Sequence, residues 1–247
     1  MKKVSELFAY LDGSIPCEYS EEWDNDGLMI GCSDKSAEKV LIVLDVNDSA
    51  VRYAVDNGFD VIVSHHPLIF SPLRSVVSDK IITLIKNDIA VFSFHTRLDN
   101  NIPGVNDALA VKLGLCGIGA EGMLRIGDLQ EQMTAERFAD HIRVALGAKS
   151  ITSVVNHDNI RRVAVLGGSG KDYIAEAVKA GADTYVTGEV SYNALSEAKD
   201  DTAINIFTAG HYETEFPVCE LLRKMIGDFD YEIVTEVGDF NNLSTIC

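Results

Sequence analysis

Basic residues, cysteine pairs and long apolar runs are all scarce in this chain, and each shortage excludes a class of protein. The 247 residues include 21 lysines and arginines against 38 aspartates and glutamates, which gives a net charge of −17. Such a charge disfavours nucleic-acid binding, because proteins meet a phosphate backbone with clustered positive charge. No apolar run reaches the ~20 residues of a membrane helix, and the first residues lack a signal-peptide segment. We therefore expect a cytoplasmic protein.

The cysteines and prolines exclude further classes. The five cysteines are odd in number and widely spaced, without a Cys-x-x-Cys pair. This pattern indicates neither a disulfide framework nor a thiolate zinc site, and it is typical of a reducing compartment. The five prolines are scattered, and no low-complexity linker is present. Any two domains should therefore be closely joined.

What the chain does contain is an alternation of short β-branched runs with amphipathic segments, in a composition that is 47% hydrophobic. This alternation predicts an α/β fold with a mostly parallel sheet. Strands are expected at residues 39–45, 60–64, 89–94, 161–166, 183–187 and 203–208. Helices are expected at residues 48–57, 78–87, 104–113, 134–145, 171–180, 190–199 and 213–226.

The two halves of the chain show the same order of elements. In each half a strand ending in leucine is followed by a helix, a Gly-x-Asp turn, a second strand, a second helix and a third strand with histidine after it. We interpret this as a duplicated βαβαβ arrangement of two similar, closely joined lobes. The first lobe is predicted at residues 1–120 and the second at 121–247, with residues 121–130 as the bridge. The C-terminal strand can return to pack on the first lobe.

Four of the six histidines follow predicted strands. In open parallel sheets, working groups collect beyond the carboxyl ends of the strands. Two of these histidines also have a carboxylate four residues further on. Imidazole with carboxylate is the usual ligand set for zinc, manganese or iron, so the sequence predicts a metal site at these strand ends. The candidate residues are His65, His66, His95 with Asp99, and His211 with Glu215.

The spacing of these residues indicates how they could share metal ions. If a helix begins beside His211, Glu215 lies one turn further on the same face, so the two side chains can hold one ion. Neighbouring residues of a strand point to opposite faces, so His65 and His66 are expected to bind separate ions unless the strand has already ended. A bridging carboxylate would then join two ions that share a water of lowered pKa.

Structural roles are the alternative for each residue taken singly, because a lone histidine at a strand end is more often hydrogen bonded than a ligand. His141 and His157 lack such companions and are expected to be solvated. The turn Gly167–Gly170 either receives a phosphate through its amides or is a plain βα turn. Glu189 is either a supporting acid or a solvated helix-start residue, and residues 21–27 are either an active-site wall or a capped loop.

Several motifs together resemble a known family. EEWDNDGLMIG, VSHHPLIF, FSFHTRLD, VLGGSG, GADTYVTGE and GHYETE occur in this order across essentially the whole chain. In this the chain is similar to the Nif-three-like family, whose members are described as dinuclear-metal-centre hexameric proteins and are often named GTP cyclohydrolase 1 type 2 homologues. Two departures are an asparagine, Asn193, where the family often has histidine, and the ending NNLSTIC.

The resemblance implies a ligand set and an assembly. It implies two divalent metal ions per chain, of zinc, manganese or iron, at the strand carboxyl ends between the lobes. It also implies a homo-oligomer in the form of a toroidal hexamer. His95 matches a further histidine of the family's site, either an extra ligand or a proton shuttle and here the candidate catalytic residue. The implied metal ligands are His65, His66, Asp99, His211 and Glu215, with Glu215 as the natural bridge.

The leading functional hypothesis is a dinuclear metal-dependent hydrolase with a small-molecule substrate, such as a nucleotide. By resemblance to a GTP cyclohydrolase, it would open a purine ring and release formate. A triphosphate would require a local positive surface, for which the candidates are Arg97, Arg161, Arg162 and Lys171; without such a surface a less charged substrate is preferable. Two alternatives remain open: a metal-binding protein without turnover, and a regulatory scaffold that forms a ring with structural metals.

Overall fold

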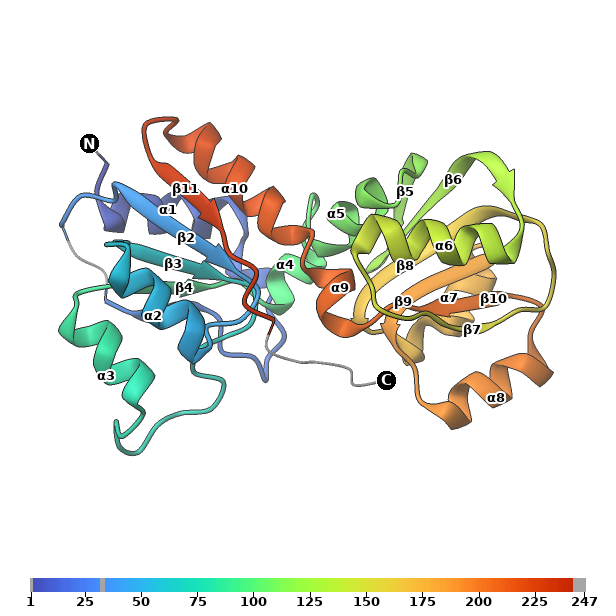
Figure 1. Cartoon of the computed structure of the whole chain (residues 1–247), viewed down its shortest axis with the longest axis horizontal. Coiled ribbons are helices and arrows are strands. Elements are labelled where there is room, and N and C mark those ends of the chain that lie inside the picture. Colours follow the sequence, from blue (N-terminus) through green and yellow to red (C-terminus); the bar gives the residue numbers. More distant parts are fainter. Residues whose placement is uncertain (1, 32–33, 242–247) are drawn as a thin grey trace. The chain divides into compact units, whose positions relative to one another are not determined.

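The chain divides into two compact units in the computed structural model, which describes residues 2–31 and 34–241 (Figure 1). The first unit contains the described residues up to Asn101 together with those from Val218 onward, and the second unit contains residues 102–217. The sequence predicts a single division at residue 120, whereas these units part after Asn101 and the chain re-enters the first unit at Val218. The ending NNLSTIC, noted above as a departure from the family, lies outside the described residues from residue 242 on.

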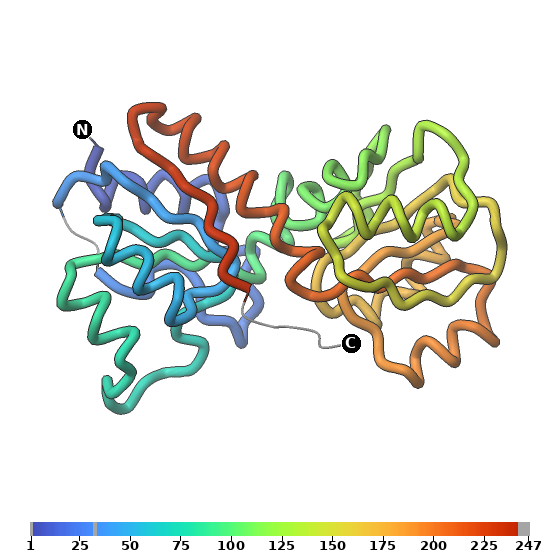
Figure 2. The backbone as a smooth tube through the Cα atoms, in the orientation of Figure 1, coloured from blue at the N-terminus to red at the C-terminus, as the bar shows by residue number. Residues whose placement is uncertain are grey.

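A five-stranded sheet forms the centre of the first unit, in the order β1-β4-β3-β2-β11. Strands β2, β3, β4 and β11 run parallel, and β1 pairs antiparallel with β4 at one edge. The last strand, β11, lies beside β2 although nearly the whole chain separates them (Figure 2). This pairing is the physical reason that the C-terminal segment belongs to the first unit. The bounds are β1 (Gly27–Ile30), β2 (Lys39–Val43), β3 (Val61–Ser64), β4 (Ala90–Ser93) and β11 (Val234–Val237).

Helices cover both faces of this sheet. Leu41, Ile62 and Val91 pack with α2 (Asp48–Asp56) and α3 (Asp79–Lys86) on one face. On the other face, α1 (Val4–Ser14) packs Phe8 against Phe92 of β4, and α10 (Val218–Phe229) packs beside α1 and β2. Because successive strand residues point to opposite faces and both faces are covered, the buried runs of β2 to β4 are apolar up to the serines that end β3 and β4, Ser64 and Ser93. A short 3₁₀ helix, η1 (Cys17–Tyr19), and α4 (Thr96–Asn100) complete the unit.

The second unit is built on a six-stranded sheet in the order β5-β6-β8-β9-β10-β7. Its central strands β8, β9 and β10 are parallel, and β5, β6 and β7 are joined antiparallel at the two sides. The bounds are β5 (Cys116–Glu121), β6 (Leu124–Met133), β7 (Thr152–Val154), β8 (Ile160–Ser169), β9 (Thr184–Glu189) and β10 (Asn205–Thr208).

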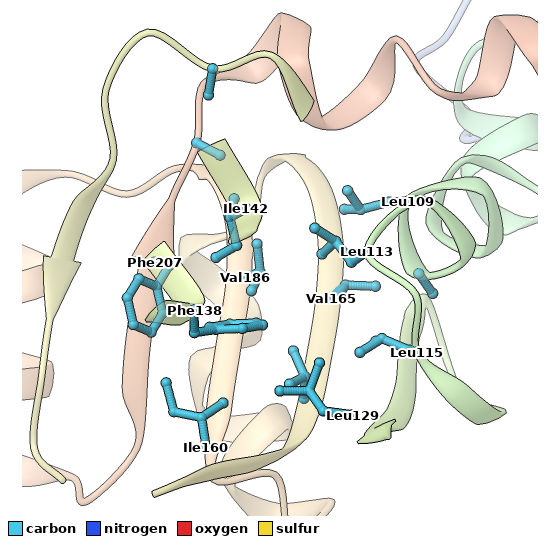
Figure 3. Close-up of a cluster of buried hydrophobic side chains, with 14 of the residues drawn as sticks. Leu109, Leu113, Leu115, Leu129, Phe138, Ile142, Ile160, Val165, Val186 and Phe207 are labelled. Carbon is cyan, nitrogen blue, oxygen red and sulfur yellow. The ribbon is translucent and has the colours of Figure 1, made fainter. Parts of the chain in front are cut away.

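Alternate residues of these strands enter two separate cores. One face packs on α5 (Val105–Lys112) and α6 (Ala135–Leu146), where Phe138 meets Phe207 edge-on and Val165 and Val186 fill the space between (Figure 3). The other face packs on α7 (Ile174–Lys179) and α8 (Tyr192–Asp201). The short helices η2 (Lys171–Tyr173) and α9 (His211–Glu215) follow β8 and β10.

The predicted fold class is confirmed. The series β2-α2-β3-α3-β4 in the first unit and β8-α7-β9-α8-β10 in the second are the two βαβαβ arrangements that the sequence indicates. The prediction of a bridge at residues 121–130 is wrong, because this segment lies inside the second unit, where it belongs to the β5-β6 hairpin and residues 124–127 are buried. Among the described residues, no helix is long and apolar enough to cross a membrane.

Candidate metal centre

Three histidines gather where the parallel strands of the first unit end. His65 and His66 follow β3, and His95 follows β4 immediately before α4. The ring centroids of His65 and His66 lie 5.0 Å apart, and His95 lies 5.4 Å from the first ring and 5.7 Å from the second. Each ring offers one nitrogen in a group whose members all lie within 4.8 Å of one another, so the three imidazoles could hold a metal ion.

His65 is fully buried, and its tautomer follows from its surroundings. Its Nδ1 lies 2.9 Å from the carbonyl oxygen of Phe94. A carbonyl oxygen can only accept, so Nδ1 carries the proton and Nε2 carries the lone pair. That Nε2 lies 3.7 Å from Oδ1 of Asp99, the carboxylate on α4. A buried lone pair next to a carboxylate is suited to a divalent cation.

His66 is held in the same way by a residue that sequence reasoning missed. Its Nδ1 lies 2.8 Å from Oδ1 of Asp45, the second residue after the end of β2. The sequence signal that could have found Asp45 was an acidic side chain at the exit of a third strand. Because β3 ends at Ser64, the expected divergence of neighbouring strand residues does not apply, and His65 and His66 present their rings side by side. Their position alone therefore does not assign them to separate ions.

His95 is oriented by Asp24, which sequence reasoning placed only within an acidic loop. Both carboxylate oxygens of Asp24 lie 3.0 Å from Nδ1 of His95. The same carboxylate accepts from the backbone amide of Thr96 at 3.0 Å and from its hydroxyl at 2.6 Å. Burial acts to raise the pKa of Asp24, but these hydrogen bonds from Thr96 and His95 outweigh it and hold the pKa below its ordinary value. An ionised Asp24 fixes the proton of His95 on Nδ1.

The helix α4 that carries Asp99 is also anchored by Arg97. This side chain is 1% exposed, and its guanidinium lies 2.8 Å from Asp12 and 3.1 Å from Asp26. Burial raises the pKa of Asp26, and the charge of Arg97 offsets this in part. Gly27, at φ +95°, leaves room for the guanidinium, since an added Cβ would lie 2.8 Å from it. Arg97 is therefore a structural ion-pair residue, and its expected role as a phosphate ligand is wrong.

The second unit places His211 and Glu215 on one face of α9. Nε2 of His211 lies 3.1 Å from Oε2 of Glu215, which confirms the expected i, i+4 geometry. On its other side, Nδ1 of His211 lies 3.5 Å from Glu189, whose side chain is 59% exposed and also accepts from the hydroxyl of Ser169. Glu189 is thus both a supporting acid for His211 and largely solvated.

Glycines shape the surroundings of α9. At Gly168, φ is +65° and an added Cβ would lie 2.2 Å from Oε1 of Glu215. The amides of Gly167, Gly168 and Gly170 donate to Asn106, to Thr214 and to the carbonyl of Glu189, at 2.8, 3.1 and 3.3 Å. These donors are therefore already used within the unit. The phosphate-binding interpretation of Gly167–Gly170 is wrong; the turn serves instead to let Glu215 approach the backbone.

The remaining histidines are structural. Nε2 of His141 lies 2.8 Å from the carbonyl of Leu113, and Nε2 of His157 lies 3.1 Å from the carbonyl of Asp183. Both are partly buried, so the expectation that they are solvated is wrong. Their hydrogen bonds join segments distant in sequence, which hydropathy and spacing do not reveal.

Known proteins are similar to this chain in sequence and in fold. The family model described as Duf34/NIF3 (NGG1p interacting factor 3) matches residues 2–238. Relatives named GTP cyclohydrolase 1 type 2 homolog include one from Clostridium perfringens, 32% identical over 96% of this chain and 98% of its own length. Another, from Streptomyces coelicolor, is 33% identical over 90% of this chain and 84% of its own.

Solved structures agree with this assignment. A Staphylococcus aureus hypothetical protein superimposes with a TM-score of 0.91 at 29% identity, over 99% of both chains. A Bacillus cereus protein related to NIF3 superimposes with a TM-score of 0.90 at 25% identity, over 100% of this chain and 99% of its own. By sequence and by fold, the chain belongs to the Duf34/NIF3 family.

Proposed function

We propose that this protein is a metal-dependent hydrolase that uses two divalent ions per chain. One observation carries the proposal: all three clustered imidazoles have an acceptor at Nδ1. These acceptors are the carbonyl of Phe94 for His65, Asp45 for His66 and Asp24 for His95. Each Nε2 therefore carries a lone pair, which is how metal-binding histidines are prepared. A purely structural cluster has no need to orient three lone pairs in the same way.

The ligands we assign come from both units. His65, His66 and Asp99 of the first unit supply two imidazoles and a carboxylate, and His211 and Glu215 of the second supply one of each. We propose these five residues as the ligands of the two ions. Glu215, whose Oε1 lies close to Gly168, would be the ligand that the two ions share. Zinc, manganese and iron all accept these ligands.

When bound, a pair of divalent ions lowers the pKa of a water and polarises the substrate. The chain itself supplies the proton transfer. Asp24 holds the Nδ1 proton of His95, so Nε2 of His95 can take a proton from the attacking water and return it to the leaving nitrogen. His95 is therefore the proposed catalytic residue, and Asp24 is a positioning residue that also caps α4 at Thr96.

The proposed reaction is the opening of a nitrogen heterocycle, as in a GTP cyclohydrolase. One water adds to the carbon between two ring nitrogens and breaks one carbon–nitrogen bond, which leaves a formamide. A second water breaks the other bond and releases formic acid; in the two steps together, the nitrogen that began with the double bond gains two protons and the other nitrogen gains one. The names of the curated relatives support this choice. Assembly as a toroidal hexamer is also part of the proposal, and light scattering of the purified protein tests it.

The test of turnover is formate release. Protein reconstituted with zinc, manganese or iron is incubated with a panel of purine nucleotides, nucleosides and bases, and formate is measured. The proposal predicts release that depends on metal and is lost in His66→Ala. Metal binding without release from any compound would instead indicate a metal-binding protein without turnover. Equal release by wild type and His66→Ala would remove the site from the reaction.

A further inference from the structure

Two large aromatic side chains lie exposed beside the histidine cluster. Trp23, the only tryptophan of the chain, is 60% exposed, and Phe70 is 52% exposed. Their ring centroids lie 6.0 Å apart, and the indole meets the ring of His95 edge-on at 6.2 Å. Aromatic rings of this size contribute most to stability or to binding when they are buried. An exposed pair of rings beside a polar cluster therefore indicates a surface to which another molecule binds.

The loops that carry these rings are fixed to each other. The Nδ2 amide of Asn25 donates to the carbonyl oxygen of Ile69, so the loops that carry Trp23 and Phe70 are joined. Asp24, which follows Trp23, is bound to His95 and Thr96. The segments that carry the two rings are therefore fixed beside His95. A preorganised aromatic pair binds a planar ring without first paying the entropy of ordering.

The charges around the pair restrict what can bind. Glu21 and Glu22 are exposed on the same loop as Trp23. Arg97 is 1% exposed and paired with two aspartates, and the exposed Arg74 lies four residues after Phe70, on the other loop. A triphosphate on the loop of Trp23 would meet carboxylates, which repel it. An uncharged ring avoids that repulsion and still gains the stacking energy.

We propose that Trp23 and Phe70 form a stacking subsite for an uncharged, planar heteroaromatic ring, such as a free base or nucleoside, and that a triphosphate contributes nothing to its binding. The inference rests on the proposed function, because the ring bound there is the one that His95 serves. It narrows the substrate to a base or nucleoside, in place of the nucleoside triphosphate that the relatives' name suggests.

Because Trp23 is the sole tryptophan, its fluorescence reports the subsite directly. Metal-free full-length protein is titrated with guanosine, adenosine, GTP and inorganic tripolyphosphate, with ribose as a reference. We expect saturable quenching by the nucleosides, no quenching by tripolyphosphate or ribose, and no tighter binding of GTP than of guanosine. Quenching by GTP alone, or displacement of guanosine by tripolyphosphate, would overturn the proposal.

Variants locate the effect. Phe70→Ala keeps the reporter and should weaken guanosine binding roughly tenfold, the effect of removing one stacking partner. Trp23→Ala, followed by calorimetry, should weaken it by at least as much. Tyr231→Ala is the matched control, because Tyr231 is 87% exposed and lies before β11, at the opposite end of its parallel strand from the site. Equal binding by Phe70→Ala, Trp23→Ala and wild type would overturn the subsite.

The failure of this inference and that of the proposed function are distinguishable. Nucleoside binding to metal-free protein needs no turnover, so quenching without formate release keeps the subsite and removes the hydrolase. Formate release with an unchanged KM in both Trp23→Ala and Phe70→Ala keeps the hydrolase and removes the subsite.

Discussion

Both units place a histidine and a carboxylate beyond a parallel strand, but different contacts hold these side chains in the two units. In the first unit, His95 and Asp99 follow β4, and buried charge holds them: Asp24 is fully buried, and Arg97 lies between two aspartates. In the second, His211 and Glu215 follow β10, and glycines surround them while the supporting acid, Glu189, is exposed. The two units thus share the strand exits, but the first relies on electrostatic support and the second on close backbone approach.

Two corresponding positions, one in each sheet, illustrate this difference. β3 is followed by His65, whereas the residue after Thr187 in β9 is Gly188. A Cβ at Gly188 would lie 2.6 Å from the carbonyl oxygen of Gly168 and 2.9 Å from Cα of His211. The second unit therefore has no space for a histidine there. The first unit has an imidazole at this position, whereas the second has glycine there and contains the buried carboxylate of Glu215 instead.

The largest expected effect comes from breaking the buried charges of the first unit. Arg97→Ala leaves Asp26 buried without its partner, and should lower the free energy of unfolding by about 3–5 kcal/mol. Urea unfolding followed by the fluorescence of Trp23, which lies in this unit, measures it. Arg223→Ala, which removes an exposed ion pair with Glu220 in the same unit, is the control and should cost about 0.5 kcal/mol or less. Equal costs for both variants would mean that Arg97 does not anchor α4.

A glycine change should have the next largest effect, in the second unit. Gly168→Ala places a methyl group against Glu215, so metal affinity should fall about 10- to 100-fold, as when the support of a ligand is removed. Gly181→Ala is the matched control, because φ there is +76° but no atom lies within 4 Å of the added Cβ. It should cost about 1–2 kcal/mol of stability and leave metal affinity unchanged. Competition with a chelator measures the affinities, and an equal loss in both variants would contradict the close approach to Glu215.

Removing the charge of the buried acid of the first unit, Asp24, should lower kcat by a factor similar to that by which Gly168→Ala lowers metal affinity. It should act only through His95. Asp24→Asn keeps the size of the side chain and an oxygen for Thr96, but no longer favours the proton on Nδ1 of His95. At full metal occupancy we expect kcat to fall about 10- to 100-fold with KM unchanged, a split that a merely structural role would not produce. Asp140→Asn, an exposed change, is the control. A rise in KM alone would assign Asp24 to binding.

The smallest effect is expected at the exposed acid of the second unit. Glu189 lies 3.5 Å from His211 and is 59% exposed, so water replaces most of its interaction. Glu189→Gln should change metal affinity by less than about threefold. If it weakens affinity as strongly as Gly168→Ala, the second unit also relies on charge, and the contrast between the units disappears.

The parallel strands, the duplication and the residues at the strand exits could be predicted from the sequence, because β-branched runs and strand-end histidines are local patterns. Support from distant residues could not. Asp24 meets His95 across 71 residues of chain, and nothing in the loop marks it. The sequence allowed a C-terminal strand to return to the first lobe but did not indicate its pairing with β2, since a short strand of mixed burial has a weak pattern. The sequence left two alternatives open for Gly167–Gly170, because the neighbours of this turn decide whether its amides are available.

The central claim is that the proposed ligands, His66 of the first unit and Glu215 of the second among them, bind two metal ions per chain. Its most direct test is the number of zinc ions per chain, measured by elemental analysis after reconstitution and removal of excess metal, for wild type, His66→Ala and Glu215→Gln. The account predicts about two per wild-type chain and a lower number in each variant, because each variant removes a proposed ligand. A wild-type value well below two, or a value unchanged in either variant, would contradict it.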